Sequence, residues 1–369
     1  MTVHILGGGP AGLYTGLQLL KRGFEVKIYE RKPDIGLSQH CTGIVSKRTI
    51  ENYDLPQKLV LNRFKGVSLK ISDNLIEVRT SIPKAYRIDR YLFEKELEYR
   101  VLNLGGDIIL NYHDVSKIRS SSEYIVDATG SISYIKDVKS DFLPSLQLEF
   151  HATDSKLYDL FDDETVYLFF DKELNRDFFI WLVKYLDRYI IGSASLQNLH
   201  KILRNTLSNW GIRNYNIIAR YYGFLIVGGP RRRFYSDRRD SVYVGDSAGQ
   251  TKPSTGGGLY YISIASRILS KKFSEGELDY STEFYKILGK EIALQKLARL
   301  IFLELDNKEF INLVEIMSRK ELLNMLLLYG DMDYHATSML NLIDKDILKY
   351  LFKHPRIISE GIKIISSIF

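Results

Sequence analysis

Cysteine is almost missing from this chain, whose 369 residues include only one, Cys41. A single cysteine excludes an internal disulfide and leaves too few thiolates for a cysteine-based zinc site. We therefore expect no bound metal. The default expectation for the protein is a reducing compartment, the cytoplasm.

Long apolar runs are also scarce. The first twenty residues carry no Asp, Glu, Lys or Arg, but Gly7-Gly8-Gly9-Pro10 interrupts them and no basic leader precedes them. A buried strand, a tight turn and a buried helix explain this stretch better than a signal peptide does. No other uncharged apolar run reaches the roughly 18 residues of a membrane span, so the sequence predicts none.

The charge balance is modestly basic, with 51 Lys and Arg against 45 Asp and Glu, a net charge of +6. This excess fits anionic partners such as phosphates, a membrane surface or nucleic acid, and it equally fits a plain soluble basic enzyme. The chain has no recognised nucleic-acid-binding motif or basic–aromatic platform, so we expect no nucleic-acid partner.

The hydrophobic pattern changes along the chain. Thr2–Leu6, Ala11–Leu20 and Glu25–Tyr29 form a compact β-α-β pattern at the start. Further elements are predicted for the hairpin Phe64–Thr80 turning at Ser72-Asp73-Asn74, the helix Asp89–Leu104, the strands Asp107–Asn111, Tyr124–Ala128 and Ser241–Gly245, and the helix Gly257–Phe273.

Short strands without long helices between them follow in the middle of the chain. They are Leu146–His151, Thr165–Phe170, Phe178–Val183 and Tyr189–Ser193, which together predict an antiparallel sheet. After Asp279 the pattern is helical to the end. We expect one domain from 1–140 with 220–280, a second from 141–219 to which the 60–85 hairpin could belong, and a helical region over 281–369.

The first glycine-rich turn has the spacing of a dinucleotide-binding fingerprint. Gly7-x-Gly9-x-x-Gly12 follows a strand and opens a helix, and Glu30 ends the next strand. Gly7 permits the tight turn, Gly9 lets the backbone approach a pyrophosphate, and Gly12 lets helix and strand pack closely. The helix N-terminus favours phosphates, and Glu30 is placed to bind ribose hydroxyls. The alternative is a structural turn beside a surface glutamate.

A second glycine-rich segment follows the predicted strand Ser241–Gly245. A turn carries Asp246, Pro253 follows, and a helix starts at Gly256-Gly257-Gly258. The segment resembles the second FAD motif of the para-hydroxybenzoate hydroxylase fold. The resemblance implies that the cofactor is FAD, that Asp246 binds its ribityl–pyrophosphate portion, and that the glycine amides face the flavin pyrimidine. A helix N-terminus would stabilise negative charge there. An ordinary flexible loop is the alternative.

Two shorter segments resemble the same class. In this class an arginine at a helix start, here Arg90, contacts FAD; a surface arginine is the alternative. Val126–Gly130 resembles an Asp-Ala-Thr-Gly turn beside the cofactor, although Thr129 stands where hydroxylases carry an aspartate. The predicted cofactor-binding set is Gly7, Gly9, Pro10, Ala11, Gly12, Glu30, Arg31, Cys41, Thr42, Gly43, Arg90, Val115, Ala128, Gly130, Asp246, Pro253, Gly256, Gly257 and Gly258.

Within this fold the chain resembles the geranylgeranyl reductase family over roughly residues 1–300. Cys41-Thr42-Gly43 is similar to the family's Cys-x-Gly segment, and Gly229-Pro230 precedes the second FAD motif at a similar spacing. Phe179–Lys184 resembles a Tyr-x-Trp-x-Phe-Pro motif that lines the substrate cavity. Trp181 is kept, whereas Phe179, Val183 and Lys184 depart from that motif. The predicted substrate residues are Phe179, Trp181, Gly229 and Pro230.

The resemblance implies a mixed α/β (α+β) fold with a Rossmann-type FAD-binding domain, an antiparallel-sheet substrate domain and a C-terminal helical region. It also implies an FAD-dependent enzyme that saturates C=C bonds of geranylgeranyl chains of lipids by hydride transfer from reduced flavin. Cys41 is the candidate catalytic residue, since a thiol could act as an acid; packing over the flavin as a small hydrophobe is the alternative.

Other functions remain open from the sequence. A flavin monooxygenase or another FAD oxidoreductase acting on an aromatic or quinone ring is the main alternative, and a non-catalytic carrier of isoprenoid lipids is another. With one complete nucleotide fingerprint, the chain must take electrons from transiently bound NAD(P)H or from a donor such as ferredoxin.

Two further features suggest contact with lipid. Arg231-Arg232-Arg233 could hold a lipid phosphate, or could be a solvated charge run. The helical tail could cap a lipid tunnel or rest peripherally on the inner face of a membrane, and packing on the FAD domain is the alternative.

Overall fold

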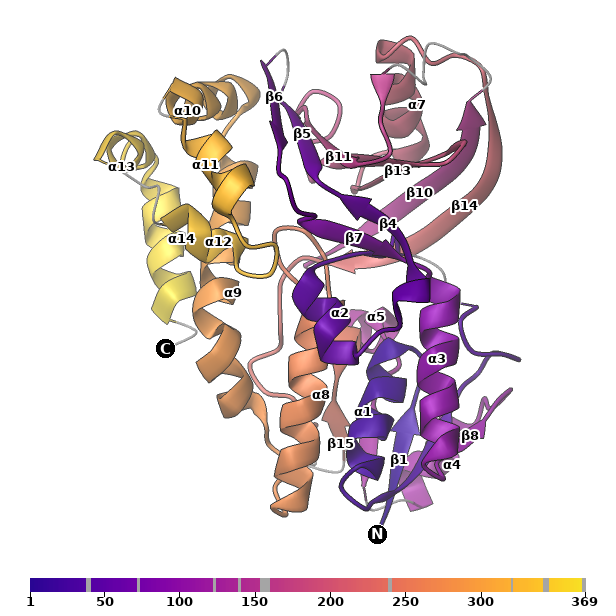
Figure 1. The fold of residues 1–369 in the computed structure, drawn as a ribbon. Helices are drawn as coiled ribbons and strands as arrows, with labels where there is room; N and C mark the ends of the chain where they lie inside the picture. The colour runs from indigo at the N-terminus through magenta and orange to yellow at the C-terminus, as the bar shows by residue number, and fades with distance from the viewer. Residues whose placement is uncertain are drawn as a thin grey trace. The chain divides into compact units, whose positions relative to one another are not determined.

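The computed structural model describes residues 1–37, 41–71, 74–121, 124–138, 141–152, 160–237, 241–319, 321–340 and 345–366. The chain divides into two compact units, each assembled from separate stretches of sequence (Figure 1). Unit 1 comprises Met1–Val60, Ile88–Phe142 and Ile226–Ile292, and unit 2 comprises Leu61–Arg87, Leu143–Leu225 and Ala293–Phe369.

Unit 1 is built on a five-stranded parallel sheet in the order β15-β9-β1-β2-β8. Its strands are β1 (Thr2–Leu6), β2 (Glu25–Tyr29), β8 (Asp107–Ile109), β9 (Ile125–Asp127) and β15 (Ser241–Tyr243). The register pairs Leu6 with Tyr29 on one side and with Asp127 on the other. Because the strands are parallel, the turns that follow β1, β9 and β15 meet at one edge of the sheet.

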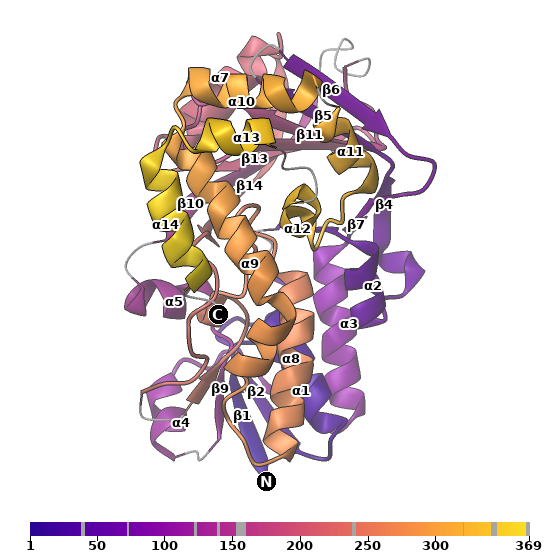
Figure 2. The same cartoon turned by 90° about the vertical axis from the view of Figure 1, so that its left-hand side faces the viewer.

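Three helices of unit 1 pack together beside this sheet (Figure 2). They are α1 (Pro10–Leu20), α3 (Arg90–Asn103) and α8 (Leu259–Ser274). Helix α1 contacts both others, and the buried hydroxyls of Thr15 and Ser266 lie 2.8 Å apart between α1 and α8. The remaining elements of unit 1 are β3 (Ile44–Val45), α2 (Lys47–Tyr53), η1 (Gln57–Leu59), α4 (Val115–Ser121), α5 (Ser131–Asp137) and η2 (Gly245–Ala248).

Unit 2 contains a seven-stranded sheet in the order β14-β10-β13-β12-β11-β5-β6. Its strands are β5 (Gly66–Ile71), β6 (Asn74–Arg79), β10 (Phe142–Ala152), β11 (Thr165–Phe170), β12 (Ile180–Tyr185), β13 (Arg188–Ala194) and β14 (Tyr215–Ile226). Strands β4 (Val60–Phe64) and β7 (Ala85–Ile88) flank the β5–β6 hairpin in sequence.

The antiparallel sheet predicted from the middle strands is confirmed, and a further strand joins it in parallel. Strands β10 to β13 are antiparallel neighbours as expected, but β5 joins β11 in parallel, with Gly66 opposite Thr165. A Cβ at Gly66 would lie 2.4 Å from the Thr165 hydroxyl, so glycine allows this close pairing. The predicted β5–β6 hairpin is confirmed, while Ser72 and Asp73 of its turn lie outside the described residues.

Strand β14 and helix α7 (Leu199–Asn209) of unit 2 were not predicted. Strand β14 carries apolar and aromatic residues on both faces, for example Ile217 with Ile218 and Tyr221 with Tyr222, which hides the period-2 alternation. Helix α7 buries Leu203 and Leu207 in the aromatic core of the sheet.

Helices alone make up the described chain after Asp279, as predicted. They are α9 (Ser281–Glu304), α10 (Asn307–Arg319), α11 (Leu322–Tyr329), α12 (His335–Leu340), α13 (Lys345–Leu351) and α14 (Pro355–Ser366). Leu305, Leu313, Ile347 and Ile357 form a buried cluster that joins several of them within unit 2. No helix in the part of the chain that the structure describes has the length and apolar character needed to cross a bilayer.

Candidate functional site

The turn after β1 can be built only from glycine at two positions. Gly7 has φ +106°, and a Cβ there would lie 2.4 Å from the carbonyl oxygen of Ala128. A Cβ at Gly12 would lie 1.9 Å from the carbonyl oxygen of Gly7. Both contacts are with backbone atoms, which cannot turn away. The turn after β1 therefore packs closely against the residue that follows β9, and the first turn of α1 packs closely against the turn after β1.

Gly9 differs from these two glycines. A Cβ at Gly9 would meet no described atom within 4 Å, and its φ of −80° suits any residue. Gly9 is the N-cap of α1, Pro10 is the first helical residue, and no described side chain caps the helix. Because the first amides of a helix lack intrahelical partners, this open end offers N–H groups to an anion.

Glu30 is fixed beside this turn at the end of β2. One oxygen of its carboxylate accepts a hydrogen bond from the Gly8 amide at 2.7 Å, and the other accepts one from the Lys32 amide at 3.0 Å. A carboxylate can accept about four hydrogen bonds, so Glu30 keeps acceptor sites for a hydroxyl donor. The side chain of Arg31 is exposed.

The second glycine-rich segment lies against the first within unit 1. Gly245 has φ +73°, and a Cβ there would lie 2.6 Å from the Cβ of Ala11 in α1. The next residue, Asp246, points its Oδ1 toward the start of α8, 3.6 Å from the position of a Cβ on Gly258. The two motifs, more than two hundred residues apart in sequence, thus occupy one end of the α1–α8 pair.

The Asp246 side chain has no hydrogen-bond partner among the described residues. Burial raises the pKa of its carboxyl, and the nearby charge of Arg90 opposes that rise. The Asp246 carboxylate is half-buried, and its oxygens can accept hydrogen bonds from the hydroxyls of a ligand. Pro253 is buried in the loop before α8, whereas Gly257 is exposed and Gly256 adopts φ +72°.

A buried side-chain relay holds the Gly245 turn. Gln250 is fully buried; its Oε1 accepts from the Gly245 amide at 2.8 Å, and its Nε2 donates to the Tyr280 hydroxyl at 2.8 Å. Tyr280 in turn donates to the carbonyl oxygen of Tyr243 at 2.5 Å, and burial raises the pKa of its phenol. Sequence reasoning missed Gln250 and Tyr280, because no local spacing links them.

Arg90 lies at the start of α3, and Asp89 caps that helix by accepting from the Leu92 amide at 2.9 Å. The Nη2 of Arg90 donates to Glu94 at 2.6 Å, and the Glu94 side chain is 3% exposed. Burial raises the pKa of the Glu94 carboxyl, and the Arg90 charge opposes the rise. The Arg90 Nε is buried and has no hydrogen-bond partner among the described residues. Sequence reasoning overlooked Glu94, although the i, i+4 spacing could have indicated the pair.

The Cys41 segment lies next to Arg90 and contacts its side chain. Gly43 has φ +78°, and a Cβ there would lie 2.6 Å from the carbonyl oxygen of Ile88, so this position also requires glycine. The Gly43 amide donates to the Cys41 sulfur at 3.4 Å, and the thiol also interacts with the Arg90 side chain. Cys41 itself is exposed, and Thr42 is half-buried.

Asp127, at the end of β9, makes several polar contacts that hold the following turn. Asp127 is 1% exposed, pairs with Arg119, and accepts from the Thr129 hydroxyl at 2.7 Å and the Ser133 hydroxyl at 3.2 Å. Gly130 has φ +81°, and a Cβ there would meet no described atom within 4 Å. Val115 packs against a small hydrophobic cluster of unit 1, which makes it a packing position in this structure.

Gly229 and Pro230 lie beside the second glycine-rich segment. The carbonyl oxygen of Gly229 accepts from the Tyr134 hydroxyl at 3.2 Å and would lie 2.6 Å from a Cβ on Gly249. The carbonyl oxygen of Pro230 accepts from the Tyr285 hydroxyl at 3.1 Å.

The adjacent Arg231 is committed to structural contacts. Its Nε donates to the carbonyl oxygen of Ser247 at 2.7 Å, its guanidinium pairs with Asp137 at 3.0 Å, and it lies 4.5 Å over the Tyr243 ring. It is therefore not available to a lipid phosphate, whereas Arg232 and Arg233 are exposed.

The predicted substrate residues Phe179 and Trp181 belong to unit 2, at and just before β12. Phe179 stacks on Phe178 with ring centroids 4.3 Å apart. A Cβ at Gly192 would lie 2.3 Å from the Trp181 ring, so the indole lies directly on the neighbouring strand β13. The Trp181 Nε1 is buried without a hydrogen-bond partner among the described residues. Phe178, Phe179 and Trp181 thus form an aromatic cluster within unit 2.

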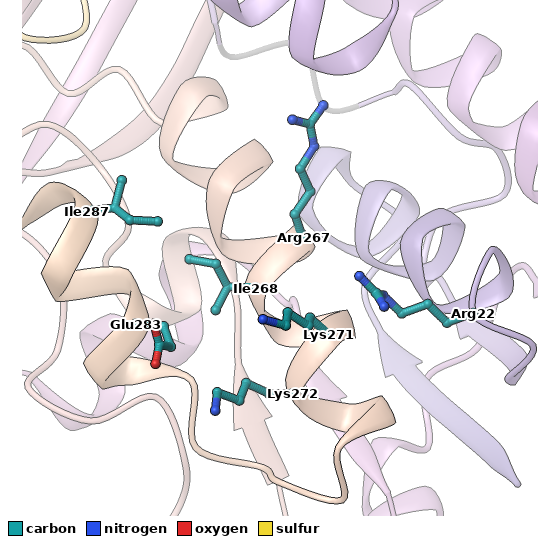
Figure 3. A pocket seen from close by; sticks show the side chains of 7 residues that line it. All are labelled: Arg22, Arg267, Ile268, Lys271, Lys272, Glu283 and Ile287. Atoms are coloured by element: carbon teal, nitrogen blue, oxygen red, sulfur yellow. The ribbon is translucent and has the colours of Figure 1, made fainter.

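A separate pocket of unit 1 has a different character (Figure 3). It lies near the C-terminal ends of α1 and α8 and is lined by Arg22, Arg267, Ile268, Lys271, Lys272, Glu283 and Ile287. Arg22 donates to the Ser270 hydroxyl at 3.1 Å, and Lys272 pairs with Glu277 at 3.0 Å. Cations at helix C-termini are stabilised by the helix dipole, which accounts for this cluster without a ligand.

Comparison with known proteins gives relatives over nearly the whole chain. Residues 5–55 match the family model of NAD(P)-binding Rossmann-like domains. An uncharacterized protein of Methanocaldococcus jannaschii is 27% identical over 91% of this chain and 92% of its own length. Digeranylgeranylglycerophospholipid reductase 2 of Methanopyrus kandleri is 25% identical over 88% of this chain and 92% of its own.

A solved structure shares the fold. The crystal structure of a geranylgeranyl bacteriochlorophyll reductase-like protein from Thermoplasma acidophilum has a TM-score of 0.76 and 17% sequence identity to this chain. The superposition covers 98% of this chain and 99% of the Thermoplasma acidophilum chain. The predicted mixed α/β fold class is therefore confirmed.

Proposed function

Given that the chain is homologous to archaeal digeranylgeranylglycerophospholipid reductases and has the fold of a geranylgeranyl reductase-like protein, we propose that it is an FAD-dependent reductase of isoprenoid lipids. In this proposal it saturates C=C bonds of geranylgeranyl chains in lipid biosynthesis. The observation that carries the proposal is a set of polar groups of unit 1, near the end of the α1–α8 pair, that lack partners among the residues the structure describes.

The residues of unit 1 fit a flavin nucleotide. The uncapped start of α1 at Gly9 and Pro10 would hold the pyrophosphate, because its amides are open and its dipole favours negative charge. Glu30 would bind ribose hydroxyls with its remaining acceptor sites. The unpartnered carboxylate of Asp246 would accept from the ribityl hydroxyls, and the buried Arg90 Nε would donate to an oxygen of the cofactor.

The glycine-rich start of α8 serves the reduced state. Gly258 is the N-cap of α8, and no described side chain caps that helix. The positive dipole end at this helix start would stabilise negative charge on the flavin. When bound and reduced, FAD supplies a hydride to one carbon of the double bond, while the other carbon takes a proton.

The substrate residues have a different task. An isolated alkene is a poor hydride acceptor, so the protein must orient the double bond and exclude water. In the proposal Phe179 and Trp181 form the apolar wall that does so, and Cys41 either delivers the proton or packs beside the ring. Alkene reduction in a Cys41→Ala variant at the wild-type rate would exclude the acid role and leave packing.

The electron donor and the location complete the proposal. One nucleotide fingerprint leaves no second dinucleotide domain, so electrons would come from transiently bound NAD(P)H or from a ferredoxin-type protein. We place the enzyme in the cytoplasm, in peripheral contact with the inner face of the membrane where its lipid substrate lies.

The test is an anaerobic single turnover. Protein loaded with FAD and reduced with dithionite is mixed with a geranylgeranyl phospholipid, and the lipid is analysed by mass spectrometry. The proposal predicts the gain of two hydrogen atoms for each saturated bond. A matched control is Gly9→Val, which should fold but bind FAD weakly and leave the lipid unchanged.

Other outcomes separate the alternatives. An oxygenated aromatic or quinone product formed with NADPH and oxygen, without alkene reduction, would favour a monooxygenase. Lipid that co-purifies with the flavin-loaded protein but is never reduced by any donor would favour a carrier.

A further inference from the structure

The outer face of α13 carries apolar and basic side chains together. Leu348 is 45% exposed and Phe352, one turn later, is 64% exposed. The Phe352 amide donates to the carbonyl oxygen of Leu348 at 2.8 Å, so helical geometry continues to Phe352 and both side chains leave the same side. Lys345 and Lys349 lie one helical turn apart on α13, beside the two apolar residues, and Lys353 follows Phe352 in the turn after the helix.

The opposite face of α13 is anchored in the core of unit 2. Ile347 is 4% exposed and packs in the cluster that contains Leu305 and Ile357, with Tyr350 and Leu351 against it. The Tyr350 hydroxyl donates to the carbonyl oxygen of Glu309 at 2.7 Å. The helix therefore has a packed inner face that holds it on unit 2. In both views α13 lies at the outside of the helical part of unit 2 (Figures 1 and 2).

The lysines on this face have no ion-pair partner in the described part of the chain, and the exposed Asp346 is the carboxylate that α13 itself carries. Lys345, Lys349 and Lys353 form no ion pair with any described residue. Nearby cations behave differently, since Arg356 pairs with Glu304 at 3.0 Å and Lys363 pairs with Glu360 at 2.7 Å. Three lysines next to a large exposed aromatic ring are the combination of side chains found on interfacial membrane helices.

We propose that this face of α13 docks on an anionic lipid bilayer. Phe352 and Leu348 would enter the boundary between headgroups and acyl chains, and the three lysines would contact headgroup phosphates. A second copy of the chain fits less well, because a twofold contact through this face would bring three lysines against three lysines. The inference rests on the membrane contact that the proposed function includes and names the surface that makes it. Its test is separate from that of the reductase activity, because bilayer binding needs neither FAD nor turnover.

The test is co-sedimentation of the full chain with vesicles at low salt. Wild-type protein should bind phosphatidylcholine vesicles that contain phosphatidylglycerol and should not bind pure phosphatidylcholine. The K345E/K349E/K353E variant should lose about a hundredfold in affinity, since each lysine near an anionic surface contributes about a fivefold effect. The L348S/F352S variant, which leaves the charge unchanged, should lose about tenfold through its lost apolar contact.

A matched control is K201E/R204E/R213E, which makes the same charge change on exposed positions in and just after α7. Its binding should stay within about twofold of wild type if the α13 face is specific. Circular dichroism checks folding, and if the lysine variant unfolds, L348S/F352S decides the question.

Three results would overturn the proposal. Wild-type protein could stay in the supernatant with anionic vesicles. The α7 control could lose as much binding as the α13 variant, which would assign the effect to net charge alone. Finally, the protein could dimerise through Phe352 and ignore vesicles, which would make a second copy the occupant of this face.

Discussion

Unit 1 and unit 2 are specified by different kinds of contact. In unit 1, close approaches of the backbone fix the site, as at Gly12 against Gly7 and Gly245 against Ala11. In unit 2, large side chains fill a sheet core, as where Phe150 stacks on Tyr189 with centroids 5.5 Å apart. The role of such a glycine can be predicted from sequence, because no other residue fits its backbone position. The role of an aromatic residue cannot, because the same residue serves equally well in a core or in a substrate wall.

The largest expected effect breaks the backbone contact at Gly12. Gly12→Ala places a methyl group 1.9 Å from the Gly7 carbonyl oxygen, and it should lower the free energy of unfolding by about 3 kcal/mol. Gly9→Ala is the matched control, because its methyl group would enter open space, and it should change that free energy by less than about 1 kcal/mol. Urea denaturation measures both. Equal losses in the two variants would contradict the backbone account of unit 1.

The next effect tests whether the Gly245 turn depends on its side-chain relay. Gln250→Leu leaves the buried Gly245 amide without its acceptor and removes the bond that the Tyr280 hydroxyl accepts, so the free energy of unfolding should fall by about 2 kcal/mol. FAD affinity should fall with it, because the turn carries Asp246. Gln197→Leu, at an exposed glutamine, is the control and should have no measurable effect. Full affinity in Gln250→Leu would show that the turn holds its form alone.

A unit 2 variant sharpens the contrast. Gly192→Ala pushes a methyl group into the Trp181 ring and should lower the free energy of unfolding by about 2 kcal/mol, while FAD affinity is unchanged. Adding Trp181→Leu should restore part of the stability by making room. An FAD affinity that falls in Gly192→Ala, measured by flavin fluorescence, would contradict the assignment of cofactor binding to unit 1.

The smallest effect concerns pH and Asp246. Burial raises the folded-state pKa of this carboxyl above its ordinary value of 3.8, so its contribution to stability is present below that value and is lost as pH rises through the folded-state pKa. Without FAD, Asp246→Asn should therefore be more stable than wild type at neutral pH. The stability difference between Asp246→Asn and wild type should shrink toward pH 4, because the Asp246 carboxyl becomes protonated and all other titrating groups are the same in both proteins. Parallel stability curves from urea titrations would contradict the prediction.

Sequence reasoning succeeded where local chemistry decides. Thr2–Leu6 and Glu25–Tyr29 are strands with the predicted bounds, and the glycine spacing at Gly7 and Gly12 is matched by close backbone contacts. Sequence reasoning did not find the features that depend on contacts between residues distant in sequence. The parallel pairing of β5 with β11 and the role of Gln250 depend on residues far away in sequence.

The partners of Arg231 could not be predicted from the sequence either. A run of three arginines indicates phosphate binding or solvation, and the sequence contains no sign that the first is held by Ser247, Asp137 and a tyrosine ring. The partner of a long side chain is set by tertiary packing. Cofactor binding by the predicted set in unit 1 stays a prediction until a flavin is titrated.

The most direct test of the account is a titration of the purified protein with FAD, followed by flavin fluorescence, for wild type and Gly9→Val. Valine suits the extended backbone at this position before Pro10, so the variant should fold, but its side chain would fill the open space at the start of α1. The account predicts one FAD per wild-type chain and at least about tenfold weaker binding in Gly9→Val. A wild-type protein that binds no FAD, or a variant that binds it equally well, would contradict the claim.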